Sequence, residues 1–146
     1  MIDNFISTDA IWLGQALENK RDVLQHIANN TSPLINLSKY ALLEGLISRE
    51  ALQSTSVGKG VALPHCVIPQ YDTVFAGFLR LENPIDFGSS DKQKTDLFLF
   101  IISSSDAGAD HLRVLAKAAR LLRSDDVRCA LRDATDKNDV LKILSQ

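Results

Sequence analysis

The sequence is poor in cysteine, glycine, proline and aromatic residues, and it has no long hydrophobic run. Its 146 residues include two cysteines, Cys66 and Cys129, too few for a disulfide framework or a four-ligand zinc site. We therefore expect both to be free thiols. The longest apolar run, from Leu97 to Ile102, falls far short of the roughly 20 residues that cross a bilayer. No membrane-spanning segment is predicted.

A strong excess of charge of either sign is also missing. The formal net charge is −2, with 23% charged and 45% apolar residues, as in ordinary globular proteins. Such a charge gives no general attraction to phosphate backbones, so nucleic acid is not an expected partner. The opening residues have neither the positive region nor the cleavage site of a secretory signal. We expect a cytoplasmic protein whose residues 1–146 form one domain.

Hydrophobic periodicity predicts a mixture of strands and helices, and therefore an α/β domain. Strands are expected at 10–17, 61–63, 73–82 and 96–102, and helices at 20–28, from a cap at Asn36 to about Arg49, from a cap at Asp110 to about Arg123, and at 125–132 and 136–144. The run 96–102 has the continuous apolar character of a central strand that is covered on both faces.

Turn-forming residues predict where these elements end. The sequence Asn-Asn-Thr-Ser-Pro at 29–33 is expected to end the first helix, and 53–60 to form a polar loop. Asn83 and Pro84 are expected to turn the chain into a partner strand at 85–87, which gives a hairpin. The expected apolar face of the second helix comprises Leu37, Tyr40, Ala41, Leu43, Glu44 and Ile47, widened by Leu42 and Leu46.

His65 is the best placed of the three histidines for chemistry. It follows Pro64, which fixes the chain at a strand terminus, and it lies just beyond Gly58 and Gly60. The missing side chains of these glycines let a ligand approach the backbone. The alternative is an ordinary surface histidine at a strand end. His26, in the middle of a helix without chemical partners nearby in the sequence, is expected to have a structural or solvated role.

His111 and Arg49 supply two further elements of an anion site. His111 falls in the first turn of a helix, where free amides and the helix dipole attract a phosphate and keep an imidazole neutral. A neutral imidazole has the lone pair that attacks phosphorus, and with an ordinary pKa of about 6.5 most molecules are neutral at pH 7. Arg49, at a helix end, offers a positive fork for phosphoryl oxygens. The alternative for Arg49 is a solvent-facing cation.

Three other kinds of site are not supported by the sequence. The glycine-bearing loop is not a nucleotide phosphate loop, because Gln53 stands at the position of the first glycine and Gly60 at that of the magnesium-binding hydroxyl. A dinucleotide fingerprint fails at Leu63, where its last glycine belongs. His65 and Cys66 lack the spaced third and fourth ligands of a metal site. We therefore expect no cofactor and no metal.

The string from Arg49 to His65, REALQSTSVGKGVALPH, resembles the phosphorylation-site signature of the enzyme IIA domains of the bacterial phosphotransferase system, in the fructose/mannitol/nitrogen-regulatory class. A second block, DHLRVLAK from Asp110 to Lys117, is similar to the other motif of that class. The resemblance covers nearly the whole chain. It implies a mixed β-sheet sandwiched between helices, a three-layer α/β/α fold.

The resemblance also implies roles for the site residues. His65 would accept a phosphoryl group, His111 would lie beside it, and Arg49 would orient or neutralise the phosphate. The donor would be a phosphorylated histidine phosphocarrier protein, and no nucleotide or metal would be required. Candidates for binding the phosphate or a partner lie in the loop before His65, namely Ser54, Thr55, Gly58, Lys59 and Gly60.

Two positions depart from the common pattern of that class. Ser56 stands where a glycine is usual, and Lys59 stands where an asparagine is usual. Ser56 would constrain a loop that glycine leaves free. Lys59 adds a positive charge that would stabilise phosphorylated His65 or alter the choice of partner, or it is simply a solvated loop cation.

The subtype rests on two blocks, from Gly60 to His65 and from Leu81 to Phe87, which resemble the nitrogen-regulatory branch more than the sugar-uptake branch. In the regulatory branch, phosphorylation would add close to two negative charges to one face and change which regulatory or transport proteins bind. One alternative is a sugar-uptake enzyme IIA that passes the phosphoryl group to a IIB domain. The other is a protein-binding module of the same fold without phosphoryl transfer.

Overall fold

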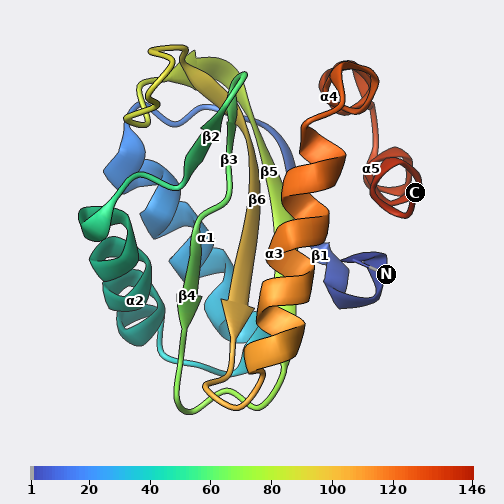
Figure 1. Cartoon of the computed structure of the whole chain (residues 1–146). Helices are drawn as coiled ribbons and strands as arrows, with labels where there is room; N and C mark the ends of the chain where they lie inside the picture. The colour runs from blue at the N-terminus through green and yellow to red at the C-terminus, as the bar shows by residue number, and fades with distance from the viewer. Residues whose placement is uncertain (1) are drawn as a thin grey trace.

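A mixed β-sheet with helices on both faces forms the structure, a computed structural model that describes residues 2–146 apart from the side chain of Asp3 (Figure 1). The elements in chain order are η1 (Ile2–Phe5), β1 (Ile6–Gln15), α1 (Lys20–Ile35), α2 (Lys39–Leu52), β2 (Ser56–Gly58), β3 (Val61–Ala62), β4 (His65–Val67), β5 (Val74–Ile85), β6 (Thr95–Ser103), α3 (Gly108–Leu122), α4 (Asp125–Asp133) and α5 (Lys137–Leu144).

Strand β6 lies at the centre of the sheet and organises the other strands. The strand order is β1-β5-β6-β3-β2, and β4 also pairs with β6. β5 runs antiparallel to β6, whereas β3 and β4 run parallel to it. β1 is parallel to β5. The apolar run predicted as a central strand is confirmed as β6.

Alternate side chains of β6 point to opposite faces of the sheet and bury two separate cores. Leu97, Leu99 and Ile101 pack with apolar residues of α3, α4 and α5, and the intervening phenylalanines and Ile102 pack with residues of α1 and α2. Figure 1 shows the two helical layers on either side of the sheet. This arrangement confirms the predicted three-layer fold, and the period-two alternation of a strand is its physical basis.

Helix α1 continues beyond the turn predicted at 29–33, and that prediction is wrong. Thr31 is fully buried on the face that also buries Ile27 and Val23, so packing keeps these turn-prone residues helical. The helix ends at Asn36, which adopts the left-handed conformation with φ 55°, as helix C-caps commonly do. Asn36 therefore ends α1 and does not cap α2.

Helix α2 begins two residues later than predicted, and its buried face differs from the predicted one. The hydroxyl of Ser38 caps it by accepting from the amides of Tyr40 and Ala41. The buried residues are Leu42, Leu46 and Glu50, at four-residue intervals, while Tyr40 and Glu44 are exposed. Leu42 and Leu46, which we predicted only to widen the apolar face, therefore lie at its centre.

The hairpin predicted at Asn83 and Pro84 is wrong, because β5 runs through both residues to Ile85. The pairing with β6 is irregular between Arg80 and Ile85. A strand tolerates proline at such an irregularity, where its missing N–H leaves no ladder bond broken. The hairpin forms instead between β5 and β6.

Two further local predictions need correction. Residues Ser56–Gly58, expected in a loop, form strand β2 and pair antiparallel with β3. Asp110 does not cap α3, since that helix starts at Gly108 after Ala107, which provides no side-chain cap. Asp110 lies in the first turn and forms an ion pair with Arg113. Within residues 2–146, no helix has both the length and the hydrophobicity to cross a membrane.

Candidate functional site

His65 stands at a strand terminus, as predicted, but it begins a separate strand, β4, that was not predicted after the strand at 61–63. It pairs with Ile101 of β6, and the carbonyl of Pro64 accepts a hydrogen bond of 3.0 Å from the amide of Ile101. The short break at Leu63 and Pro64 separates β3 from β4, two strands that pair with the same central strand. The backbone that carries the imidazole is thus fixed to the best-packed part of the sheet.

Hydrogen bonds to both ring nitrogens define the tautomer of His65. Nδ1 lies 2.8 Å from the carbonyl oxygen of Leu63, which can only accept, so Nδ1 carries the proton. Nε2 lies 3.2 Å from Nε of Arg49, a group that can only donate, so Nε2 presents its lone pair. The structure therefore leaves Nε2 as the ring nitrogen that carries the lone pair.

Arg49 lies in the last turn of α2 and spans two acceptors. Besides His65, it donates through an Nη atom to the carbonyl of Gln53 over 2.8 Å, which holds the guanidinium in one orientation. A Cβ built on Gly45, one turn earlier, would lie 3.2 Å from Cβ of Cys66. Helix α2 approaches β4 this closely because Gly45 has no side chain, and that approach brings Arg49 to His65.

His111 is contributed by α3, which packs on the opposite face of the sheet from α2. The two ring centroids are 5.6 Å apart with an interplanar angle of 54°. Nδ1 of His111 is in hydrogen-bond contact with the buried hydroxyl of Ser103, the last residue of β6. The amide of His111 donates to the carbonyl of Ala107, so it is already inside the hydrogen-bonded part of the helix. Arg49, His65 and His111 are therefore brought together.

Burial lowers the pKa of His65 and that of His111 below the ordinary value of 6.5. For His65, the charge of Arg49 lowers the pKa further, while the Leu63 carbonyl and the charge of Glu50 act in the opposite direction. For His111 the second cause is the neighbouring His65. Both rings are kept neutral near pH 7, as expected from the sequence, and burial is the first cause of the lowered pKa values.

The buried carboxylate of Glu50 contacts Thr55, one of the predicted site residues. Glu50 follows Arg49 in α2 and is 7% exposed. It accepts from the amide of Thr55 at 2.8 Å, from the Thr55 hydroxyl at 2.7 Å and from Nζ of Lys20 at 3.2 Å. Thr55, one of the predicted phosphate or partner residues, is itself buried. Its visible bonds go to Glu50, and its carbonyl accepts from the amide of Leu63.

The other predicted loop residues form hydrogen bonds with residues other than His65. Ser54 donates to the carbonyl of Phe87 at 2.7 Å and accepts from the amide of Ser56, so it fastens the segment after α2. Gly58, Lys59 and Gly60 form the turn between β2 and β3 with φ values of 86°, 59° and 81°.

That turn lies beside the start of β6, because β3 pairs with β6 at Leu97 whereas His65 pairs at Ile101. Four residues of strand correspond to about 13 Å, so the structure does not bring the turn to the imidazole. Asp91 accepts from the Lys59 amide at 2.9 Å, and Arg132 donates to the Lys59 carbonyl at 3.2 Å. A partner-binding role for this turn stays a prediction.

The remaining residues with reactive side chains lie elsewhere. The ring of His26 packs edge-on against Trp12 at 4.9 Å, in keeping with a structural role. Cys66 and Cys129 are free thiols, as expected, and burial raises the pKa of Cys66 to about 12. Among residues 2–146, no three histidine, cysteine or acidic side chains gather closely enough to hold a metal ion.

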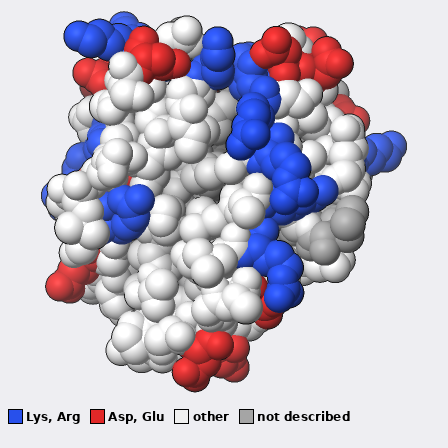
Figure 2. Space-filling model, viewed as in Figure 1, with Lys and Arg blue, Asp and Glu red and all other residues white. Residues whose placement is uncertain are grey.

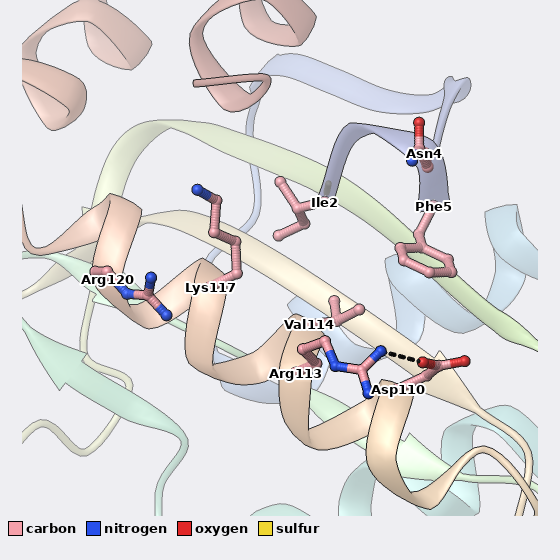
Figure 3. Close-up of a pocket in the computed structure, with 8 residues that line it drawn as sticks. All are labelled: Ile2, Asn4, Phe5, Asp110, Arg113, Val114, Lys117 and Arg120. Atoms are coloured by element: carbon pink, nitrogen blue, oxygen red, sulfur yellow. Dashed lines mark hydrogen bonds and ion pairs between the residues drawn. The ribbon is translucent and has the colours of Figure 1, made fainter.

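One groove of the surface lies between η1 and α3 and is not lined by the histidines. It encloses about 360 Å³ between η1 and α3, with Phe5 and Val114 on its apolar side and Arg113, Lys117 and Arg120 along its edge (Figure 3). Figure 2 shows a band of Lys and Arg side chains on this face of the molecule. None of the candidate site residues lines this groove.

Sequence reasoning missed two residues that contact the site. Ser103 gave no signal, because a serine after an apolar run is ordinary loop composition. Glu50 did give a signal in the sequence, because it follows Leu42 and Leu46 at four-residue spacing. It therefore occupies a core-facing position of an amphipathic helix. A charged residue at such a position requires a partner.

Comparison with known proteins agrees with this geometry. Residues 4–146 match the family described as the phosphoenolpyruvate-dependent sugar phosphotransferase system, EIIA 2. A nitrogen regulatory protein of Bradyrhizobium diazoefficiens is 38% identical over 144 residues, which cover 99% of this chain and 94% of that protein.

Two solved structures show the same fold. The nitrogen regulatory protein IIA-Ntr from Neisseria meningitidis superposes with a TM-score of 0.94 and 26% identity, over 98% of each chain. IIA mannitol from Escherichia coli superposes with a TM-score of 0.80 and 18% identity, over 94% of this chain and 97% of that one. The family match over almost the whole length confirms the resemblance drawn from the sequence motifs. The chain is a member of the EIIA 2 family of the phosphoenolpyruvate-dependent sugar phosphotransferase system.

Proposed function

We propose that this chain is a phosphocarrier of the phosphotransferase system that accepts a phosphoryl group on Nε2 of His65 and acts mainly as a nitrogen-regulatory protein. The observation that carries the proposal is the lone pair of Nε2, which points at a guanidinium while Nδ1 holds the ring through the Leu63 carbonyl. The neutral ring is the form that attacks phosphorus. Family membership supplies the reaction class.

The transfer is a displacement between two imidazoles. Nε2 of His65 forms a bond to the phosphorus of a phosphorylated histidine carrier protein, and the N–P bond of the donor breaks with its electron pair returning to the donor ring. His65 becomes cationic as the bond forms, and the Nδ1–H bond to the Leu63 carbonyl at 2.8 Å stabilises that charge. No proton has to leave the ring.

Arg49 and His111 act on the phosphoryl group itself. In the resting site Arg49 donates to the atom that will bond to phosphorus, so it must release Nε2 and then has donors free for the equatorial oxygens. The centroid of the neutral His111 ring lies 5.6 Å from that of His65. Its Nε2 is available because Nδ1 is engaged by Ser103. The two groups together hold the phosphoryl group in line for transfer.

Exposed apolar side chains near each site residue suit the docking of a carrier protein. Leu52 is 82% exposed near the end of α2, Val67 is 48% exposed at the end of β4, and Leu112 is 68% exposed beside His111. Exposed apolar groups grouped around a polar centre are typical of protein interfaces. We propose that donor and target proteins bind over this surface.

The nitrogen-regulatory output is supported by the relative from Bradyrhizobium diazoefficiens, whose name is "nitrogen regulatory protein" and which matches over nearly its whole length. Phosphorylation adds close to two negative charges at His65. Since the site lies beside the exposed apolar groups, the two states of His65 present different surfaces to a regulatory target.

The test is phosphorylation by a purified carrier. Incubation with the phosphorylated histidine carrier protein is expected to give a phosphoprotein that is labile in acid and stable in base. His65→Ala should remove the label, and His26→Ala, which changes a histidine outside the site, should keep it. Labelling that survives in His65→Ala would overturn the assignment.

The phosphorylated protein also distinguishes the regulatory function from the two alternatives, a sugar-uptake enzyme IIA and a pure binding module. A sugar-uptake enzyme IIA would pass its label rapidly to a IIB domain of the fructose or mannitol type, whereas a regulatory protein would retain it. A pure binding module would stay unlabelled while still binding a partner protein.

A further inference from the structure

We propose that Glu50 is a positioning residue for phosphoryl transfer, which acts on Nδ1 of His65 through Thr55 and Leu63. The inference rests on the proposed function, since it assigns a residue to the same reaction. Glu50 makes no contact with His65 in the hydrogen-bond pattern, and its effect passes through two intervening residues. Arg49 and Glu50 would then control the two nitrogens of one ring by separate routes.

The first step of the route is the anchoring of Thr55. One carboxylate oxygen of Glu50 accepts from the Thr55 amide at 2.8 Å, and the other accepts from the Thr55 hydroxyl at 2.7 Å. Both ends of a buried threonine are therefore bound to one buried carboxylate. Hydrogen bonds to a charged acceptor are short and about twice as strong as neutral ones, so Thr55 is held firmly.

The second step runs through the backbone. The carbonyl of Thr55 accepts from the amide of Leu63 at 3.0 Å, and the carbonyl of Leu63 accepts from Nδ1 of His65 at 2.8 Å. The orientation of the Leu63 peptide is thus set from one side by Thr55. This carbonyl is the group that fixes the tautomer and stabilises the developing positive charge of the ring.

The carboxylate itself is fixed from a third direction. Nζ of Lys20, at the start of α1, lies 3.2 Å from Glu50 and 4.7 Å above the centre of the Phe87 ring. Lys20 therefore compensates the buried charge, which would otherwise be costly. Glu50 joins α1, α2 and the segment after α2 at one point.

Electrostatics supports the same assignment. The negative charge of Glu50 raises the pKa of His65, whereas burial and Arg49 lower it. A group that favours the cationic ring also favours the phosphorylated ring, which carries a positive charge while Nδ1 stays protonated. The arrangement is comparable to a carboxylate that orients a catalytic histidine, although here the backbone of Leu63 stands between them.

A structural anchor alone would give a different outcome from a positioning residue. Removing a buried carboxylate lowers the stability of any protein, so a loss of stability decides nothing. The distinguishing quantities are the ring signals of His65 and the transfer rate of the folded protein. The NMR signals of the His65 ring can be measured without a phosphoryl donor.

The experiment compares Glu50→Gln with Glu44→Gln, which changes an exposed glutamate on the same helix. Nitrogen NMR of the imidazole reports the tautomer and the pKa of His65, and rapid-quench kinetics with the phosphorylated carrier reports transfer. In Glu50→Gln we expect a weaker Nδ1–H bond, a lower pKa of His65 and about tenfold slower transfer. Glu44→Gln should match the wild type in all three.

A second pair of variants tests the inference even if Glu50→Gln lowers the stability of the folded protein. Thr55→Ser retains the hydroxyl and should transfer at nearly the wild-type rate, whereas Thr55→Val removes it and should shift the His65 signals in the same direction as Glu50→Gln. Unchanged ring signals and an unchanged rate per folded molecule in Glu50→Gln and Thr55→Val would overturn the inference. A wild-type protein that accepts no phosphoryl group would overturn the proposed function, while the NMR comparison would still decide the role of Glu50.

Discussion

The rings of His65 and His111 lie 5.6 Å apart at an interplanar angle of 54°, and a single strand sets both of them. Ile101 of β6 pairs with His65, and Ser103, further along the same strand, holds Nδ1 of His111. Because eight of the nine residues of β6 are buried, we expect movements of the exposed loops to have little effect on the distance between the rings. The geometry of the pair is therefore a property of the sheet core.

Arg49 is expected to be more than a positive charge. Arg49→Lys keeps the charge but cannot bridge Gln53 and His65 with a planar fork, so we expect about tenfold slower transfer, and about a hundredfold for Arg49→Gln. Rapid-quench kinetics with the phosphorylated carrier measures both. Arg21→Gln, at an exposed position of α1, should behave as the wild type. Equal rates for Arg49→Lys and the wild type would show that the fork is not used.

His111 is expected to assist transfer without being essential. In His111→Ala the nucleophile and its Leu63 bond remain, so labelling of His65 should continue but slow by about 10- to 100-fold. The rates of phosphoryl gain from the carrier and of return to it should fall together, because the same transition state serves both directions. If both rates stay unchanged, His111 is a bystander.

Acid is expected to weaken the fold through its histidines first. The folded-state pKa values of His26, His65 and His111 are all lowered by burial, so the unfolded chain binds more protons below pH 6.5. This contribution to stability is complete above about pH 7 and is lost as the pH falls through the lowered values. The urea concentration at the midpoint of unfolding should be lower at pH 5.5 than at pH 7.5. A double variant, His65→Gln with His111→Gln, should reduce this difference.

Lys59 is expected to be a neutral departure from the family pattern for the transfer step. Its backbone is held by Asp91 and Arg132, and its turn pairs with the far end of β6 from His65. Asparagine tolerates the left-handed conformation of φ 59°. Lys59→Asn should therefore label within about threefold of the wild type. A larger change would place the Lys59 side chain in contact with the phosphoryl group or with the carrier.

Gly77 is expected to be irreplaceable for packing. A Cβ at this position of β5 would lie 2.6 Å from the carbonyl oxygen of Ala10 and 2.2 Å from the Phe100 ring. Gly77→Ala should destabilise the protein by at least about 2 kcal/mol, measured by urea unfolding. Gly108→Ala is the matched control, because nothing lies within 4 Å of its added Cβ. It should stay within about 0.5 kcal/mol of the wild type.

Local patterns predicted the elements that depend on short-range order. The apolar run of β6, the two C-terminal helices and the placement of His65 at a strand terminus were all predictable, because periodicity and proline act over a few residues. The errors occurred where packing overrides local preference. Thr31 stays helical because it is buried, and Pro84 stays in a strand because the pairing is irregular there.

The sequence by itself determined the family of this protein, since the block from Arg49 to His65 resembles the signature of that family, and it predicted the roles of His65 and Arg49. Only the tertiary structure decided which neighbours share the site. In the folded chain Glu50 accepts a hydrogen bond from Thr55, and Ser103 contacts His111. The turn at Lys59 lies away from His65. The reason is register along β6. Parallel pairing of β3 and β4 with one strand converts positions in the chain into distances in space, and no local pattern contains that information.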